Sequence, residues 1–450
     1  MLDLVPKLNY DALVELGLYL SFEATLNDKQ LWRTFENAVL ENFHLYELQH
    51  ICQIQWAVTQ LKPKYTSQRL DVMLHNFARE KIDQGNISLD DFHDIMQGFR
   101  NKKSKDFYLK LKAIMIDQKE QLIGSESEAQ RAKNLSELFF SFASNKPGKF
   151  GVYADYAIEE VDELIAHYED DLVNAVQHLN ADEVTRLAQA MYLLKSAKYE
   201  NVWRRIENKV HDLIEDEMSG LDAYHVTNLL RAFSRSQNNT MAGSNKLFVH
   251  LEPFIIRNMG QFQGRDLGHV MYAYSVRNVG NPELYKAFDA RIEGLIAYEV
   301  FDYPMLSNLI YYMLFRTNTN ETIWKAIVEH TAASDDVLPL TYYKPFKFSK
   351  FFLAAHFPEW DLSDYLDKFY YAERYFNQIQ LDDYGQRVYK YTEMKAFLNQ
   401  KCLVYPIVFM TLHNLFNLHY VFYDFKIAIN YHVQELCDPI TKQPNERMKL

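Results

Sequence analysis

Apolar residues recur along the chain at helical spacing, in a pattern that repeats about every 41 residues. Each copy has apolar residues at its first and fourth positions, a small residue at its seventh and a bulky apolar residue at its eighth. These offsets place the four side chains on one helical face. The copies begin at Leu13, Ile51, Phe92, Leu135, Val184, Val226, Leu267, Leu306 and Phe348, at spacings between 38 and 49 residues.

The seventh position is small in seven of the nine copies, and only Tyr19 and Tyr312 depart from this rule. A small side chain at a fixed place lets a neighbouring helix approach closely, as stacked helical repeats require. The small residues are Ala57, Gly98, Ser141, Ala190, Ala232, Ala273 and Ala354.

A second helix is predicted 15 to 20 residues after several of the copies, opening on two apolar residues with a third at helical spacing. The clearest examples are Leu31-Trp32 with Phe35, Val202-Trp203 with Ile206, Leu284-Tyr285 with Phe288, and Ile323-Trp324 with Ile327. We therefore predict an all-α fold, an α-solenoid of about nine helix-turn-helix repeats over residues 1–356.

The repeat fades after residue 356, and residues 357–450 are predicted to form an aromatic-rich helical C-terminal region. Its segment 402–423 has no Asp, Glu, Lys or Arg. We interpret this run as a buried helix that caps the repeats, or as a helix that contacts a membrane or a membrane-embedded subunit. Pro406, two Asn and two His make it a poor transmembrane span.

Composition narrows the possible functions. The formal net charge is −12, which counts against a protein that grips nucleic acid along its length. Three scattered cysteines, Cys52, Cys402 and Cys437, indicate reduced thiols rather than a disulfide framework. The first twenty residues hold three acids and one Lys, unlike a transit peptide, so we expect either no presequence or numbering that begins after one was removed.

No catalytic, cofactor-binding or metal-ligating residue is predicted. His413 and His419 are six residues apart and do not share a helical face. The acidic run 159–163 is typical of a solvated helix face. In segment 83–94 the Gly is at the wrong position for a calcium loop, and no Glu closes it.

One basic cluster is present, and it has three interpretations. The plainest is a solvated loop between helices, and the others are contact with phosphate or RNA and docking to an acidic partner. The cluster consists of Arg100, Lys102, Lys103 and Lys105, followed by Lys110 and Lys112.

The apolar-x-x-apolar-x-x-small-bulky motif followed by a second helix, over residues 10–356, resembles the organellar heptatricopeptide and octotricopeptide repeat proteins. The resemblance implies a mitochondrial location, in the matrix or on the matrix side of the inner membrane. It also implies either RNA binding or a non-catalytic role in a large organellar assembly.

Together these features predict a non-catalytic scaffold rather than an enzyme. We expect an accessory subunit of a mitochondrial assembly of the respiratory-chain or ATP-synthase type, with several protein partners. Segment 402–423 is a candidate contact with a membrane-embedded subunit. The alternative is an organellar RNA-binding or mitoribosome-associated protein, and the charge on the concave face of the solenoid should distinguish the two: basic for RNA, neutral or acidic for protein.

Overall fold

The computed structural model shows a chain whose regular structure is almost entirely α-helical, so the predicted all-α class is confirmed. The structure describes residues 4–22, 29–60, 68–99, 105–144, 157–216, 220–234, 236–237, 240–299, 301–334, 338–339 and 342–369, and the backbone of 408–413, 416–422 and 427–429.

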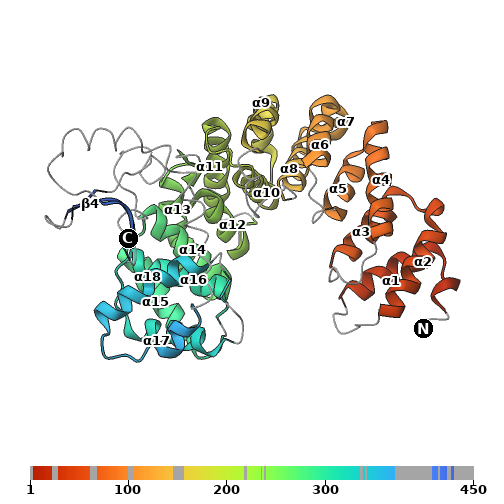
Figure 1. The fold of residues 1–450 in the computed structure, drawn as a ribbon. Coiled ribbons are helices and arrows are strands. Elements are labelled where there is room, and N and C mark those ends of the chain that lie inside the picture. The colour runs from red at the N-terminus through yellow and green to blue at the C-terminus, as the bar shows by residue number, and fades with distance from the viewer. Residues whose placement is uncertain are drawn as a thin grey trace. The chain divides into compact units, whose positions relative to one another are not determined.

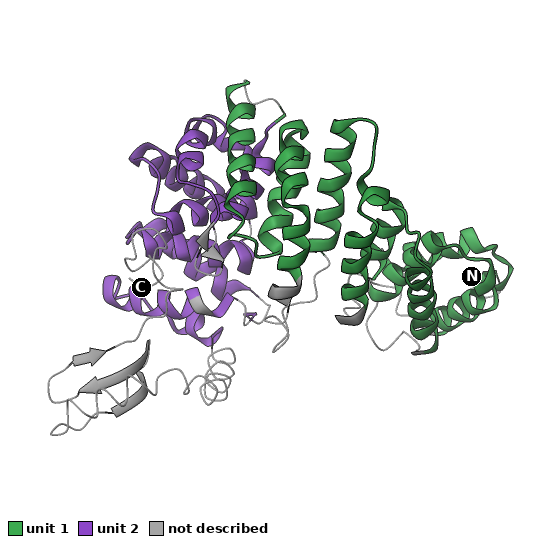
Figure 2. Ribbon diagram, turned by 90° about the horizontal axis from the view of Figure 1, so that it is seen from above, with its two compact units in different colours: residues 1–220 green, residues 221–450 purple. Residues whose placement is uncertain are grey.

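The chain forms two compact units, residues 1–220 and 221–450 (Figure 2). This division falls inside the region where the sequence motif repeats. The sequence analysis placed a domain boundary between residues 356 and 357, where the motif fades. The division at residue 220 does not test that boundary, which stays a prediction.

Unit 1 consists of two layers of helices (Figure 1). In the first layer α1, α3, α5, α8 and α10 pack against one another in that order. In the second layer α4, α6, α9 and α11 do the same, while α2 packs on α1 and the short α7 contacts α5, α6 and α8. The helices are α1 (Tyr10–Phe22), α2 (Lys29–Glu41), α3 (Leu48–Gln60), α4 (Gln68–Gln84), α5 (Leu89–Gly98), α6 (Lys105–Asp117), α7 (Lys119–Ile123), α8 (Glu128–Ser144), α9 (Ala157–Ala175), α10 (Ala181–Leu193) and α11 (Glu200–Glu215).

Unit 2 has the same two-layer construction. Helices α12, α14, α16 and α18 pack in sequence in the first layer, and α13, α15, α17 and α19 in the second. The helices are α12 (Ala223–Ser234), α13 (Lys246–Arg257), α14 (Gly264–Arg277), α15 (Pro282–Ile296), α16 (Tyr303–Phe315), α17 (Glu321–Ala333), α18 (Tyr343–His356) and α19 (Ser363–Asp367). A short ladder, β1 (Ser236–Gln237) with β2 (Thr240–Met241), separates α12 from α13.

Polar caps fix where many helices begin. Ser88 and Asp91 form a capping box at α5, and Asn180 with Glu183 forms another at α10. Asn281 caps α15 and is followed by Pro282, which suits the first helical turn because its missing N–H would have no partner there. The Asp83–Asp94 segment is therefore a helix start rather than a calcium loop.

The apolar motif positions build the core of both units. The first residue of each of the first eight copies is at most 1% exposed and lies in a first-layer helix. The aromatic openings of the second-layer helices are buried as well, with Trp203 and Trp324 among the largest enclosed side chains. Burial of each such side chain contributes about 1.5–3 kcal/mol.

Small residues sit where first-layer helices approach one another. Ala190, Ala232 and Ala273 are at most 1% exposed. A Cβ placed on Gly98 of α5 would lie 2.5 Å from the carbonyl oxygen of Cys52 in α3. The two backbones touch at this point, so no larger residue fits there without displacing a helix.

The last copy of the motif is out of register with the prediction. Phe346, Ser349 and Leu353 are the fully buried residues of α18, whereas Phe348 is half-buried and Ala354 and Ala355 are exposed. The buried positions of α18 therefore begin two residues earlier than expected, at Phe346. Because α18 is aromatic on several sides, the apolar pattern alone did not select the buried face.

The prediction of a helix over residues 402–423 is wrong. The backbone forms an antiparallel sheet of β3 (Val408–His413), β4 (Phe416–Phe422) and β5 (Ile427–Ile429). Residues 416–422 alternate between aromatic or aliphatic and mostly polar side chains, and this period of two belongs to a strand. The helical form of this segment is corrected, while its contact with a membrane-embedded subunit stays a prediction.

Overpacking a first-layer crossing should destabilise unit 2. Ala232→Leu adds a bulky side chain at a position that is 1% exposed, so it should lower the free energy of unfolding by about 1–3 kcal/mol. Ala354→Leu is the matched control, because Ala354 is exposed. Urea titration of the two variants tests the register, and equal midpoints would contradict it.

Candidate functional site

The surface most suited to binding is the exposed face of the first-layer helices. Three positions of each motif copy lie on the side of the helix opposite the buried residues, because an α-helix turns every 3.6 residues. They are the position two residues before the copy and the third and sixth positions within it. We call these positions the first-helix face. Most of them are exposed or half-buried where the structure describes them. The sequence analysis did not identify these positions as a binding surface, because it followed the apolar residues. Their constant offset from the motif is the signal in the sequence that could have identified them.

In unit 1 the first-helix face is predominantly acidic. An ion pair of 3.7 Å between Arg186 and Glu137 joins α10 to α8 across it. Beside it, His93 and Ser141 make a 2.7 Å hydrogen bond between α5 and α8. The charged residues of the face are Asp11, Glu15, Asp90, Asp94, Glu137 and Asp182, against Lys133 and Arg186.

In unit 2 the same positions carry no Asp or Glu and several aromatic rings. The Tyr272 and Tyr311 ring centroids lie 5.4 Å apart, and Tyr311 stacks on Phe315 of the same helix at 5.6 Å. His269 and Asn308 form a 2.9 Å hydrogen bond between α14 and α16. The described residues at these positions are Tyr224, Asn228, Arg231, Arg265, His269, Tyr272, Pro304, Asn308, Tyr311, Phe348 and Phe351, of which Asn228, Tyr272 and Asn308 are buried.

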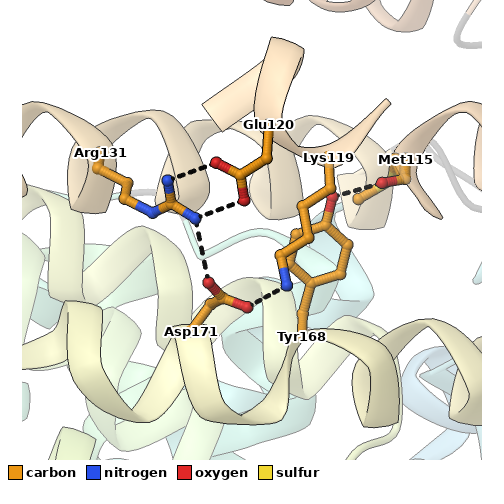
Figure 3. Close-up of polar contacts among 6 residues, drawn as sticks. All are labelled: Met115, Lys119, Glu120, Arg131, Tyr168 and Asp171. Atoms are coloured by element: carbon orange, nitrogen blue, oxygen red, sulfur yellow. Dashed lines mark hydrogen bonds and ion pairs between the residues drawn. The ribbon is translucent and has the colours of Figure 1, made fainter. Parts of the chain in front are cut away.

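A dense cluster of charged groups lies in unit 1, where α7, α8 and α9 meet (Figure 3). The Arg131 guanidinium donates two hydrogen bonds of 2.8 Å to the Glu120 carboxylate and a third of 3.3 Å to Asp171. Lys119 forms an ion pair with the other Asp171 oxygen and lies 5.0 Å from the centre of the Tyr168 ring. The Tyr168 hydroxyl donates to the Met115 carbonyl at 2.5 Å.

The charged groups of this cluster hold helices together, and their pKa values do not suit acid–base catalysis. The hydrogen bonds from Arg131 lower the pKa of Glu120, so that carboxylate stays ionised. Burial raises the pKa of Tyr168, and its hydroxyl is already bonded. A general acid or base needs a pKa near the working pH, and neither group has one. The cluster therefore joins three helices and offers no acid–base pair.

A second polar cluster joins α15 to α16 in unit 2. The Tyr312 hydroxyl donates to Asp289 at 2.5 Å, and the Asn318 amide donates to both oxygens of that carboxylate at 3.1 and 3.2 Å. Burial raises the pKa of Asp289 despite these hydrogen bonds. The Arg316 guanidinium lies nearby, 4.0 Å from the centre of the Tyr285 ring.

The basic cluster from the sequence is only partly described. Arg100, Lys102 and Lys103 lie outside the described residues, and Lys105 begins α6. Lys110 pairs with Asp83, and Lys112 pairs with Glu163 at 2.5 Å. These two lysines lie within helix α6 and join it to α4 and α9, so for their part of the cluster the interpretation as a solvated loop is wrong.

The other predicted candidates are dispersed. Asp162 and Glu163 of the acidic run pair separately with Lys198 and Lys112. His413 and His419 lie on different strands. Across the described residues no group of three His, Cys, Asp or Glu side chains could hold a metal ion. Within the same residues no helix is both long and apolar enough to cross a membrane.

Removing the guanidinium of Arg131 should loosen the packing of α8 against α7 and α9. Arg131→Gln loses a two-pronged ion pair and a second carboxylate contact, so we expect the free energy of unfolding to fall by about 1 kcal/mol. Lys325→Gln breaks the exposed pair of Lys325 with Glu321 within α17 and a 5.6 Å contact with the Trp360 ring, and it should change stability much less. Denaturant titration compares the two, and equal effects would show that the cluster adds no stability.

Asp289 should make the stability of unit 2 depend on pH. Its folded pKa is raised above the ordinary 3.8. Between those two values the folded state binds more protons than the unfolded state, so this contribution to stability falls as pH rises. Asp289→Asn lacks the titration, and its stability relative to wild type should increase from pH 3.8 to pH 7. Unfolding free energies across that range test this, and parallel curves would contradict it.

No protein-family model matches the sequence, and no curated protein matches it either.

Proposed function

We propose that the chain is a non-catalytic α-solenoid scaffold that uses its first-helix faces to bind several protein partners within a large assembly. The observation that carries the proposal is the chemical contrast between the two faces. The face in unit 1 is mostly acidic, and the face in unit 2 combines aromatic rings with cationic side chains and has no acid.

The arrangement of helices supports a solenoid. Within each unit, first-layer helices pack only in chain order, and the second layer follows the same order. A repeat array of this kind places equivalent positions of successive repeats side by side, which produces long binding surfaces. The period near 41 residues and the total of about nine repeats are part of this proposal.

The charged groups that lie between helices serve packing, which supports a binding role for the protein rather than catalysis. Charged groups of both units join one helix to the next, as in the Arg131 ion pairs and the hydrogen bond from Tyr312 to the Asp289 carboxylate. Exposed aromatic side chains such as Tyr224, which is 56% exposed, are typical of protein interfaces.

The mitochondrial setting comes from the resemblance of the repeat motif to organellar helical-repeat proteins. We propose an accessory subunit of an assembly of the respiratory-chain or ATP-synthase type, in the matrix or on the matrix side of the inner membrane. The acidic face in unit 1 favours protein over RNA as a ligand, because phosphate backbones are repelled by carboxylates.

Native-gel migration and the composition of the co-purified complex test this proposal. We expect the wild-type chain to migrate in a large complex in a mitochondrial fraction. Reversing charge on the unit 1 face with Glu15→Lys and Asp94→Lys should reduce its share of that complex severalfold, because two acids at the surface become cations.

Glu80→Lys with Glu215→Lys is the matched control. It makes the same change of charge at exposed positions of the second-layer helices α4 and α11, and should leave assembly intact. A wild-type chain that migrates as a free monomer, or one that co-purifies chiefly with RNA, would overturn the scaffold function.

A further inference from the structure

Three adjacent helices of unit 1, α1, α3 and α5, form a surface that is acidic and partly apolar. Helix α3 packs between α1 and α5 in the first layer. It has no charge at its three positions on the first-helix face, whereas α1 and α5 have two acids each. Two rows of carboxylates therefore lie on either side of a neutral row that contains the half-buried Trp56. The positions are Asp11, Glu15 and Leu18 in α1, Gln49, Gln53 and Trp56 in α3, and Asp90, Asp94 and Gln97 in α5.

The negative charge of this surface is not offset within the three helices, which contain no Lys or Arg. In the part of the chain that the structure describes, Glu15, Asp90 and Asp94 form no ion pair with a Lys or Arg of another helix. Burial raises the pKa of Asp94, His93 opposes this rise, and the Asp91 and Asp90 carboxylates add to it. A cation from outside the three helices would stabilise these carboxylates.

Close packing fixes the distance between the two acidic rows. A Cβ on Gly98 of α5 would lie 2.5 Å from the Cys52 carbonyl oxygen of α3, so these two helices approach as nearly as their backbones allow. Packed helices are about 8–10 Å apart, which places the carboxylates of α1 about 16–20 Å from those of α5. Trp56 lies on the helix midway between them.

An extended peptide matches this spacing. In the polyproline II conformation every third side chain is on the same side, and each turn advances about 9 Å. A segment with cations at its first and seventh positions therefore spans about 19 Å and brings its fourth side chain midway. Lys or Arg at the two ends would meet the two acidic rows, while an apolar fourth residue packs on Trp56. Nucleic acid is disfavoured, because the carboxylates repel its phosphates.

We infer that α1, α3 and α5 bind an extended basic segment of a partner protein, with its cations at the carboxylates of Glu15 and Asp94 and an apolar side chain between them on Trp56. The inference rests on the proposed scaffold function and specifies the class of partner for the unit 1 face. Charge complementarity sets the orientation and rate of such binding. The apolar contact adds affinity because it removes further apolar surface from water.

Fluorescence anisotropy with labelled peptides tests the inference on the full chain. The probe contains Lys-Pro-Pro-Leu-Pro-Pro-Lys, in which the prolines hold the extended conformation. One comparison peptide has Glu in place of both Lys, and another has the same composition with the two Lys adjacent. The probe should bind at least about tenfold more tightly than the Glu peptide, and severalfold more tightly than the peptide with adjacent Lys.

Two variants separate the charged contact from the apolar one. Asp94→Asn should weaken binding of the probe about threefold, because it removes one charge at the surface, and Trp56→Ala should weaken it about tenfold. The matched controls lie on α4, away from the face: Glu80→Gln changes an exposed acid, and Val72→Ala an apolar side chain that is 47% exposed. Both controls should bind the probe as wild type does. Circular dichroism checks that all four variants are folded, and Asp94→Asn keeps the test decisive if Trp56→Ala is not.

Four results would overturn the inference. They are no binding of the probe at about 1 mM, equal binding of the Glu peptide, equal binding of the peptide with adjacent Lys, and equal losses in the Asp94 and Glu80 variants. Dimers of the chain that Asp94→Asn dissociates and that exclude the probe would instead assign the surface to a second copy. If the probe fails to bind while the chain still enters its large complex, the scaffold function stands and only this assignment falls.

Discussion

The close approach of first-layer helices is the constraint on which the rest of each unit depends. At Gly98 the backbones of α3 and α5 are so near that an added Cβ would lie 2.5 Å from the Cys52 carbonyl oxygen. Alanine holds the equivalent place in α10, α12 and α14, where it is almost fully enclosed. Because each helix must fit against the one before it, the small residue at each crossing sets the spacing of the layer.

Polar contacts then fix how the second layer attaches. Arg131 joins α8 to α7 and α9 through two carboxylates, and the Tyr312 hydroxyl joins α16 to Asp289 on α15. Arg131, Asp171 and Tyr312 are at least partly withdrawn from water, so a missing partner would be costly and a correct partner selects one arrangement. The same contacts occupy the side chains that acid–base chemistry would need, which agrees with a proposed role in binding.

The buried faces of the helices pack against one another in the core. Binding to a partner would therefore use the outward positions of the first-layer helices. These positions vary freely in charge because they contribute little to the core. In unit 1 they are mostly acidic, and in unit 2 they carry no acid and include Arg231 and the half-buried Tyr311. One backbone plan can thus present two chemically different surfaces, which is the basis for proposing more than one protein partner.

The sequence by itself determined the helices, their order and most of the buried positions, because a period of 3.6 residues and fixed small residues are local properties of the chain. It placed the first buried position of α18 at Phe348 instead of Phe346, and it predicted a helix over residues 402–423, within which 408–413 and 416–422 are strands. Aromatic side chains around α18 fit more than one buried face, and pairing of β3 with β4 depends on a partner strand that no local pattern contains. Only the tertiary structure decided which side chains the packed layers leave outward, because exposure of Arg231 or Tyr224 is set by the neighbouring helices.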